Sequence, residues 1–554
     1  MQQIYKEISE ALKQKSHTKD EISRLKISLS KKYGLGKIPS DLDILINAPQ
    51  ASTTLAQLVT KPTRTSSGVA VVAIMTKPHR CPHGRCSYCP GGINSYYGSV
   101  PQSYTGREPA TMRAIRNHYD PYLQIFNRLE QYALLGHSYE KVELIVMGGT
   151  FPALSKSYRE SFVAESFKAM NDFGRIFRNK REFFMRVFEI AGDKDDKNRI
   201  ERIQHKILSY KGEAELAAVQ RQNEHARVRC VALCVETRPD YCAKRHINEM
   251  LRLGTTRVEL GVQSLNDSVL KHIKRGHTVE KSIVSTQLLK DSFFKVGYHM
   301  MPGLPLSSYT ADLKMLNELF TNPDYRPDAL KIYPCMVMPG TKLFREYKNS
   351  EYKPLTTKRA AQLIAKFKAI VPKYCRIMRI QRDIPTKVTC AGVDRTNLRQ
   401  YVQKLMKEKG VKCRCIRCRE PRNRVVDLSK INVLKQTYEA SGGHEIFISA
   451  EDTKNDIIVG FCRLRIPNKP FRKEITKKSA GVRELHVYGD AAHIGEHGII
   501  QHRGVGSRLL REAEDVAQQY DCTKMVVISG IGARAYYRKH GYKKQGPYMV
   551  KRNG

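Results

Sequence analysis

The chain has 554 residues, with 96 Lys and Arg against 54 Asp and Glu and a formal net charge of +42. This length exceeds what one ordinary hydrophobic core supports, so we expect two or three domains, and the positive charge indicates a polyanionic partner rather than a merely solvated basic surface. No run of about 18 apolar residues and no apolar N-terminal signal segment occurs, which argues against a membrane-spanning or secreted protein and favours a cytoplasmic one. Its 14 cysteines therefore predict metal ligands and buried thiols rather than disulfides.

Two charged helical segments are predicted. Residues 1–64 mix Lys and Arg with Ile and Leu at helical intervals, as at Ile22, Leu25 and Leu29, which predicts a basic helical extension or a helical cap on the next domain. Residues 155–226 are rich in Arg, Lys, Glu and Phe at helical spacing. We expect the second segment to be a solvent-facing helical insertion.

Three cysteines stand close together at Cys81, Cys86 and Cys89. Three thiolates on one loop can ligate three irons of a 4Fe–4S cluster and leave the fourth iron open, which is the arrangement of radical S-adenosylmethionine (SAM) enzymes. The first spacing is one residue longer than the commonest pattern of that superfamily, so the loop must bulge. A zinc knuckle is the alternative, but it needs a fourth ligand, and His83 lies too close to Cys81 for tetrahedral closure.

Six short apolar runs alternate with helix-like segments, at 69–75, 142–147, 228–235, 257–262, 296–300 and 329–333. This alternation predicts an α/β fold over residues 65–388, with a parallel sheet curled into a partial (β/α)6 barrel. Ligands of such sheets bind at the carboxyl ends of the strands. Gly148 and Gly149 follow the second run, Glu236 the third and Gln263 the fourth, so we expect these residues to line one ligand site.

A second cysteine group follows at Cys413, Cys415 and Cys418. A structural tetrahedral zinc site needs a fourth ligand, for which Cys390 is the first candidate and Cys375 the second. Three thiolates favour zinc over a second iron–sulfur cluster in this context. The sequence thus predicts a zinc-binding linker over residues 389–422 that joins the barrel to the next domain.

From residue 423 to 554 the pattern changes to antiparallel strands around one glycine-rich turn. Strands are predicted at 444–448, 457–466 and 484–488, and the turn Gln-His-Arg-Gly-Val-Gly at 501–506 precedes a predicted helix at 507–520 and a strand at 524–528. Backbone N–H groups at such a turn bind pyrophosphate. The turn resembles the acetyl-CoA loop of Gcn5-related N-acetyltransferases, and Tyr536 and Tyr537 stand where that fold places a tyrosine near the CoA sulfur.

The two halves together resemble a known family. The motifs that carry the resemblance are Cys-Pro-His at 81–83, Cys-Pro-Gly-Gly at 89–92, Ser-Tyr-Thr-Gly-Arg-Glu-Pro at 103–109, Gln-Arg-Asp-Ile-Pro at 381–385 and Tyr-Tyr-Arg-Lys at 536–539. A radical SAM half followed in one chain by an acetyltransferase half is similar to the catalytic subunits of Elongator. The short spacing from Cys81 to Cys86 is similar to archaeal or bacterial members, which suggests action without the other Elongator subunits.

This resemblance implies an acyltransferase that uses acetyl-CoA and a SAM-derived 5′-deoxyadenosyl radical to modify carbon 5 of the wobble uridine of tRNA. The implied partner is the anticodon stem-loop, held through its phosphates, and the protein is expected to be a monomer or a homodimer. The implied residues are Cys81, Cys86 and Cys89 for the 4Fe–4S cluster; Gly148, Gly149, Glu236, Gln263 and Lys141 for SAM and other cofactor contacts; Gln501, Arg503, Gly504, Val505 and Gly506 for acetyl-CoA; and Tyr536 and Tyr537 for catalysis.

The alternative function is a protein lysine (histone) acetyltransferase in which the iron–sulfur domain is only structural. Transfer to lysine needs a carboxylate base to deprotonate the ammonium group. Glu484, which opens the predicted strand before the glycine-rich turn, is a candidate for that base. A tRNA-binding scaffold with relic cofactor sites is a third hypothesis, and the intact cysteines and glycine-rich turn argue against it.

Overall fold

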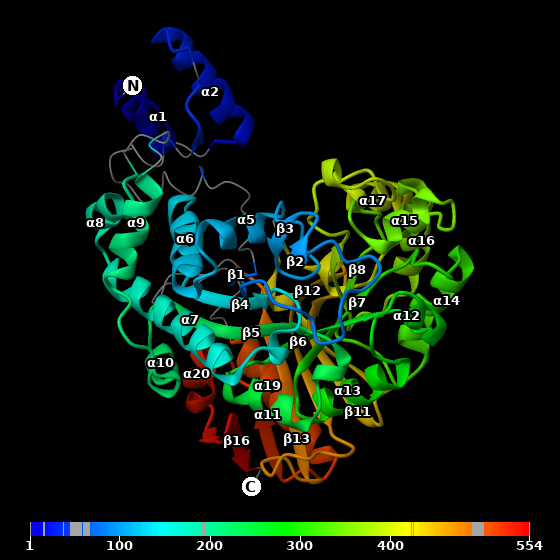
Figure 1. The fold of residues 1–554 in the computed structure, drawn as a ribbon. Helices are drawn as coiled ribbons and strands as arrows, with labels where there is room; N and C mark the ends of the chain where they lie inside the picture. Colours follow the sequence, from blue (N-terminus) through cyan, green and yellow to red (C-terminus); the bar gives the residue numbers. More distant parts are fainter. Residues whose placement is uncertain are drawn as a thin grey trace.

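The computed structural model of the chain describes residues 2–14, 17–36, 38–41, 43–44, 58, 67–190, 196, 198–422, 424, 426–489 and 504–552. Two seven-stranded sheets dominate it, one in residues 67–422, called the barrel half, and one in residues 426–552, called the C-terminal half (Figure 1). A two-stranded hairpin of β2 (Gly92–Ser95) and β3 (Gly98–Val100) directly follows the first cysteine group.

The sheet of the barrel half is entirely parallel, and its strands follow one another in chain order. They are β1 (Ala70–Met75), β4 (Lys141–Met147), β5 (Arg229–Thr237), β6 (Arg257–Gln263), β7 (Lys295–Met300), β8 (Ala329–Ile332) and β9 (Arg376–Ile380). The partial barrel and its six predicted strands are confirmed. The seventh strand, β9, was missed because it holds only three apolar residues within a strongly basic stretch.

Helices connect these strands and cover the outer face of the sheet. They are α5 (Pro109–Arg116), α6 (Pro121–Leu134), α7 (Lys156–Ile176), α8 (Arg181–Val187), α9 (Arg199–Leu208), α10 (Leu216–Asn223), α11 (Lys244–Arg252), α12 (Asp267–His272), α13 (Val279–Asp291), α14 (Tyr309–Thr321), α15 (Lys342–Lys348), α16 (Thr357–Ile370), α17 (Leu398–Glu408) and α18 (Ile416–Arg419). Local sequence fixes where they begin. The side chain of Asp120, for example, accepts a hydrogen bond from the N–H of Leu123, and Pro121 occupies the first turn of α6.

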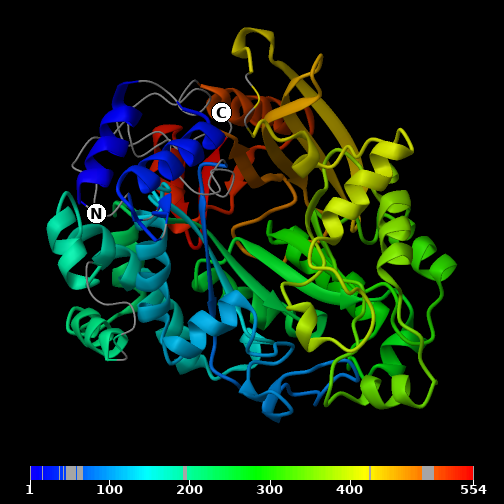
Figure 2. The same cartoon turned by 90° about the horizontal axis from the view of Figure 1, so that it is seen from above.

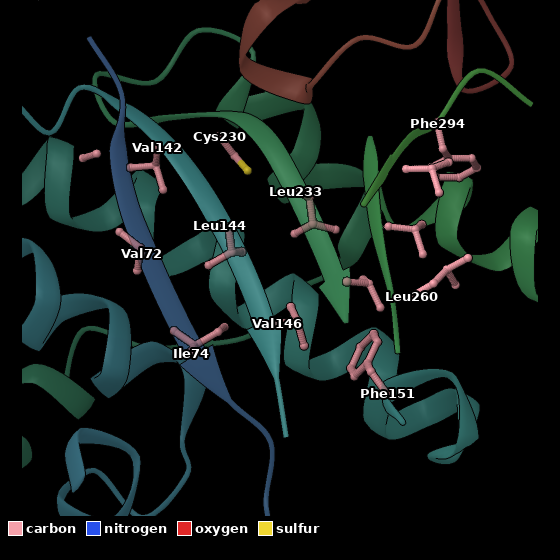
Figure 3. Close-up of a cluster of buried hydrophobic side chains, with 14 of the residues drawn as sticks. Val72, Ile74, Val142, Leu144, Val146, Phe151, Cys230, Leu233, Leu260 and Phe294 are labelled. Carbon is pink, nitrogen blue, oxygen red and sulfur yellow. The ribbon is translucent and has the colours of Figure 1, made fainter. Parts of the chain in front are cut away.

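Strand β4 shows how the sheet separates core from cavity. Its alternate residues Val142, Leu144 and Val146 are fully buried on the helix-covered face, where Figure 3 shows them packing beside Val72 and Leu233. The residues between them point to the opposite face, because successive side chains of a strand alternate. Each strand therefore contributes to the hydrophobic core with one face and to the concave inner surface with the other.

The segment predicted as a solvent-facing insertion is instead part of this core. Helix α7 buries Phe162, Phe167 and Phe173 almost completely. The ring of Phe173 lies 5.4 Å from that of Phe126 on α6, in an edge-to-face arrangement. The expectation of a solvated insertion is wrong because most charged residues of α7 occupy its outer face, and the buried Asp172 accepts a hydrogen bond from the Tyr122 hydroxyl.

The sheet of the C-terminal half is mixed, with the order β10-β11-β12-β13-β14-β16-β15. Its strands are β10 (Asn432–Ala440), β11 (Gly443–Asp452), β12 (Ile457–Ile466), β13 (Ser479–Val487), β14 (Lys524–Val527), β15 (Lys543–Gln545) and β16 (Tyr548–Arg552), with helices α19 (Val505–Gln519) and α20 (Arg534–Lys539). β13 pairs in parallel with β14 only over residues 479–482. Beyond that point β13 continues without β14, and the two strands leave an opening between them.

Buried ion pairs join the two halves. Arg483 of β13 lies 2.7 Å from Asp328, which precedes β8, and Arg465 of β12 lies 2.6 Å from Asp291 at the end of α13. All four side chains are almost fully buried. Removing one partner would leave an uncompensated buried charge, so these pairs fix how the halves dock. Figure 2 shows the orange and red strands of the C-terminal half packed along the green strands of the barrel half.

The N-terminal extension forms its own small cluster of two helices, α1 (Gln2–Gln14) and α2 (Lys19–Lys32), at the edge of the molecule (Figure 1). Thr18 and Glu21 form a capping box at the start of α2. Ile4, Ile8 and Ile22 pack together between the helices. In the part of the chain that the structure describes, no helix is both long and apolar enough to cross a membrane.

Candidate functional site

One cavity, which we call the chamber, reaches from the first cysteine group to the C-terminal half. Its volume is about 2080 Å³, and it is lined at one end by Cys81, Cys86 and Cys89 and at the other by Gly504 and Tyr536. Typical small-molecule pockets measure roughly 300–1,000 Å³. The chamber can therefore accommodate more than one ligand at once.

The wall of the chamber is the inner face of the parallel sheet. Lys141, Glu143, Ile145 and Met147 of β4 all line it, as the alternation of that strand requires. Further along the wall, Glu484 and the rest of the end of β13, which pairs with β12 but not with β14, continue the surface into the C-terminal half. The separation of β13 from β14 thus opens the C-terminal half toward the barrel.

The first cysteine group lies on a loop that follows β1. The longer first spacing is taken up by a tight turn, in which the N–H of Gly84 donates to the carbonyl of Cys81 at 2.9 Å. The sulfur of Cys86 lies 3.2 Å from Nε2 of His83, and the sulfur of Cys89 accepts the N–H of Ser103 at 3.2 Å. Such N–H···S contacts stabilise thiolate ligands.

The chemistry of these thiols fits a metal cluster. Burial and, to a smaller extent, the nearby Cys86 thiol raise the pKa of Cys89 to about 11. Ionised thiols at this depth need a bound cation. All three thiols are buried and line the same end of the chamber, which fits three protein ligands of one iron–sulfur cluster.

Gly148 and Gly149 lie at the carboxyl end of β4, beside the cysteine loop. Their φ angles are +120° and +110°, values that favour glycine. A Cβ on Gly148 would stand 2.3 Å from Oγ1 of Thr76. The backbone therefore carries no side chain at these two positions, and Gly149 faces the chamber.

Glu236 and Gln263 end β5 and β6 on the same side of the sheet. Gln263 adopts a φ of +73°, and its buried Oε1 accepts no hydrogen bond from the residues that the structure describes. Backbone strain and an unpaired buried acceptor are typical of a ligand-binding position. Burial raises the pKa of Glu236, but Lys331, whose Nζ lies 2.6 Å from the carboxylate, outweighs burial and brings the pKa to about 2. Glu236 is thus an ionised acceptor facing the chamber.

Glu259 and His299, which the sequence analysis did not identify as site residues, lie beside Glu236. Nε2 of His299 lies 2.6 Å from the carboxylate of Glu259, and Lys331 also pairs with Glu259. Glu259 is a charged residue within β6, a strand that is buried along its whole length. In the sequence, the signal for this part of the site was a glutamate within a largely apolar run.

Lys141 lies at the opposite end of the strand from the glycine pair. It is the first residue of β4 and is paired in register with Arg229, the first residue of β5. A Cβ on Gly532, in the C-terminal half, would stand 2.5 Å from Cβ of Arg229. The structure therefore places Lys141 at the acetyltransferase-like end of the chamber, away from the predicted SAM residues.

The glycine-rich turn and the tyrosine pair meet at that end. Gly504 has a φ of +82° and begins α19. No side chain of the described residues caps this helix end, and Val505 and Gly506, whose N–H groups point out of its first turn, line the chamber. A Cβ on Gly506 would lie 3.0 Å from the Tyr536 hydroxyl. That hydroxyl is buried beside Ser507 and makes no well-aligned hydrogen bond within the described residues. Gln501 and Arg503 lie outside the described residues.

Both tyrosines of the pair line the chamber, but they differ in how they are packed. The rings of Tyr536 and Tyr537 lie 5.3 Å apart in an edge-to-face arrangement, and Tyr537 packs against Tyr542 at 5.9 Å. Burial raises the pKa of Tyr537 well above its ordinary value. Tyr536 is therefore the better placed of the two to meet a ligand.

Glu484, the candidate base for lysine acetylation, is held in ion pairs. Its carboxylate pairs with Lys295 of β7 and lies 2.8 Å from Nε of Arg463. Burial raises its pKa, but Lys295 and Arg463 outweigh burial and bring the pKa to about 2. A carboxylate with that pKa is a weak proton acceptor, which counts against the lysine acetyltransferase alternative.

The second cysteine group is compact. The sulfurs of Cys413, Cys415 and Cys418 all lie within 4.8 Å of one another, and the ammonium of Lys368 lies 3.5 Å from Cys418. Cys390 is not with them: it is exposed, and its N–H donates to the carbonyl of Val337 at 2.8 Å. This placement contradicts the choice of Cys390 as fourth ligand, because the loop that carries it pairs with a different part of the barrel half. Cys375 is buried next to Cys415.

Comparison with known protein families gives four matches in chain order. They are the ELP3 N-terminal domain over residues 1–66, the Radical SAM superfamily over 75–316, the Radical_SAM C-terminal domain over 327–408 and the Acetyltransferase (GNAT) family over 415–542. The radical SAM match implies SAM and an iron–sulfur cluster, and the acetyltransferase match implies acetyl-CoA.

Individual relatives match over nearly their whole length. A tRNA uridine(34) acetyltransferase of Methanocaldococcus infernus is 46% identical, covering 100% of this chain and 98% of the relative. One of Methanocaldococcus jannaschii is 47% identical, covering 94% and 91%, and Elongator complex protein 3 of Drosophila melanogaster is 42% identical, covering 98% and 95%.

A solved structure supports the same relationship. The archaeal Elp3 of Methanocaldococcus infernus, with an N-terminal deletion, has a TM-score of 0.72 and 44% identity, covering 88% of this chain and 99% of that chain. The predicted fold class, a radical SAM half-barrel followed by a Gcn5-related acetyltransferase domain, is thereby confirmed. The order of the domains, the full-length similarity and the chamber between the two halves agree: this chain belongs to the Elongator protein 3 family.

Proposed function

We propose that this protein is a tRNA uridine(34) acetyltransferase, which uses acetyl-CoA and SAM to modify carbon 5 of the wobble uridine. The observation that carries this proposal is the chamber, because one continuous cavity is lined by both the cysteine loop and the glycine-rich turn. A radical generated at one end and an acyl group delivered at the other can meet there without leaving the protein.

At the barrel end, Cys81, Cys86 and Cys89 hold a 4Fe–4S cluster. Gly148 and Gly149 let the amino acid part of SAM approach the backbone, while Glu236 and Gln263 accept hydrogen bonds from its hydroxyl or amino groups. The raised pKa of Cys89, the bare glycine backbone and the unpaired Oε1 of Gln263 support this assignment. When bound, the cluster and SAM supply a carbon-centred radical by one-electron cleavage of SAM.

At the other end, Gln501, Arg503, Gly504, Val505 and Gly506 bind the pyrophosphate of acetyl-CoA. The uncapped start of α19 supports this, because free N–H groups and the helix dipole favour an anion. The buried hydroxyl of Tyr536 donates to the thioester carbonyl or to the departing sulfur. Tyr537 holds Tyr536 in place by edge-to-face packing, and Lys141 lines the chamber at this same end.

The tRNA partner approaches the basic residues that line the chamber beside β9 and α17, which include Arg379, Arg382 and Arg399. The net charge of +42 supports a partner rich in phosphate. The guanidinium of Arg382 lies 5.6 Å from the ring centre of Tyr104, and aromatic side chains of this kind stack on unpaired bases.

We further propose that Cys413, Cys415 and Cys418 bind zinc in a linker over residues 389–422, with a fourth ligand other than Cys390. The linker separates a radical SAM domain at 65–388 from an acetyltransferase domain at 423–554, and an extension at 1–64 precedes them. The compact arrangement of the three sulfurs supports the zinc site.

The test is a reaction of anaerobically reconstituted protein with SAM, a reductant, acetyl-CoA and tRNA, followed by mass spectrometry of the nucleosides. We expect a wobble uridine modified at carbon 5, lost in Cys86→Ala and retained in the control Cys522→Ala. Acetyl-lysine formed without modified uridine would instead favour the lysine acetyltransferase alternative. Neither product would favour the scaffold hypothesis.

A further inference from the structure

Arg275 lies behind the cysteine loop, just after α12, and its guanidinium is buried. Its Nη1 lies 3.7 Å from the sulfur of Cys86. Its Nε and Nη2 donate to the carbonyl of Gly261 at 3.2 and 2.5 Å. A Cβ on Gly261 would stand 2.4 Å from Nη2, so a glycine is needed there for the guanidinium to lie across β6.

Within the described residues, no Asp or Glu forms an ion pair with Arg275, and the groups that raise its pKa most against burial are the Tyr88 hydroxyl and the Cys86 and Cys81 thiols. The neighbouring Arg238 differs, because its guanidinium lies 2.7 Å from Asp240. A buried charge without a counter-ion is unfavourable. The cysteine ligands and whatever they bind are therefore the counter-ion of Arg275.

The position of Arg275 is tied to the loop itself. The N–H of Ser87, between the second and third cysteines, donates to the carbonyl of Ile273 at 3.0 Å. The carbonyl of Ser87 accepts the N–H of Leu343 at 2.9 Å. The loop and the segment that carries Arg275 are thus held together, which fixes the distance from the guanidinium to Cys86.

We propose that Arg275 raises the reduction potential of the cluster by placing a fixed positive charge and an N–H donor at the Cys86 ligand. This inference rests on the proposed 4Fe–4S cluster at Cys81, Cys86 and Cys89. One-electron reduction by an external low-potential donor, such as dithionite, adds one negative charge to the cluster. A buried cation nearby stabilises the more negative, reduced state, and hydrogen bonds to the ligand sulfur act in the same direction.

The experiment compares wild-type protein with Arg275→Gln, which removes the charge, and Arg275→Lys, which keeps it. Each is reconstituted anaerobically without SAM, its iron content is measured, and the cluster is titrated potentiometrically with its EPR signal as readout. We expect the equilibrium constant for reduction to fall at least tenfold in Arg275→Gln, a drop of ~59 mV for one electron. Arg275→Lys retains most of the wild-type potential.

The matched control is Arg128→Gln. Arg128 lines the same chamber but stacks on Tyr132, near the start of β1 and away from the loop that follows the end of this strand. Its loss leaves the potential unchanged.

The outcomes separate this inference from the function on which it rests. Full iron content with an unchanged potential in Arg275→Gln overturns the role of Arg275 and leaves the cluster in place. Wild-type protein that binds no iron overturns the cluster itself. If neither Arg275 variant binds iron while wild type does, Arg275 is needed for assembly, and the proposal that it sets the potential is overturned.

Discussion

Lys295 of β7 and Glu484 of β13 form an ion pair across the junction between the radical SAM and acetyltransferase halves. Both line the chamber, so the same pair docks the halves and forms part of the reaction space. Arg463 also reaches Glu484, at 2.8 Å. The two halves are thus joined at the surface that both ligands must share.

Lys295→Ala is expected to destabilise the protein by about 3–5 kcal/mol, because it leaves a buried carboxylate short of one partner. Chemical denaturation followed by circular dichroism measures this. The double variant Lys295→Ala/Glu484→Ala should recover part of the loss. A double variant as unstable as the sum of the two single variants would show that the residues do not interact.

Acid should weaken the fold through Glu236 and Glu484, whose pKa values are both lowered to about 2. A folded pKa below the unfolded value of about 4.3 gives stability that is complete above about pH 4.3 and is lost as pH falls toward 2. Each carboxylate then contributes at most about 3 kcal/mol. Unfolding free energies measured between pH 7 and pH 3 should fall less steeply in Glu236→Gln than in wild type, and an identical slope would contradict this.

Gly148→Ala is expected to reduce SAM binding at least tenfold, because the new methyl group meets Thr76 and the residue must keep a φ of +120°. The strain costs about 1–3 kcal/mol. Equilibrium dialysis with reconstituted protein measures the binding. Gly410→Ala is the control: it also has a positive φ, of +63°, but open space around it, so it should lose some stability and bind SAM normally.

Tyr536→Phe should lower the rate of acetyl-CoA turnover in the presence of tRNA by about 10²-fold, as expected for the loss of one hydrogen-bond donor to a reacting carbonyl. Affinity for acetyl-CoA, measured by calorimetry, should change little. Tyr520→Phe, on an exposed ring, serves as the control. A large loss of affinity with an unchanged rate would assign Tyr536 to binding alone.

We expect the zinc content of single cysteine variants to distinguish Cys390 from the proposed ligands of the second cysteine group. Cys415→Ser is expected to lose zinc and to lower the melting temperature, because structural zinc sites stabilise the fold directly. Cys390→Ser should retain zinc, since its thiol lies elsewhere. Elemental analysis of both purified variants provides the measurement, and equal zinc loss in the two would restore Cys390 as a ligand.

Much of the fold could be predicted from local patterns of apolar residues in the sequence. The six apolar runs of the barrel half and the run at 457–466 matched strands closely, because buried strands are built mostly from apolar residues. Strand β9 and the burial of α7 were not predicted, because charged residues spread along both segments conceal which face of the strand or helix is buried. The motifs predicted Gly506 and Tyr536 at one acetyl-CoA site, whereas the grouping of Glu236, Glu259 and His299 depends on three strands meeting in space. The prediction that Cys390 lies with the second cysteine group failed because closeness in sequence does not determine which part of the fold a loop contacts.

The alternation along β4 has a consequence for how this protein can change. Val142 and its alternate neighbours fill the core, while Lys141 and Glu143 line the chamber. Inserting a single residue in this strand would exchange the two sets of side chains. Charged side chains would then enter the helix-packed core, and apolar side chains would face the chamber. Insertions and deletions are therefore tolerated only in the loops that connect β4 to its neighbours, or within β4 in steps of two residues. The core and the chamber thus constrain the length of this strand together.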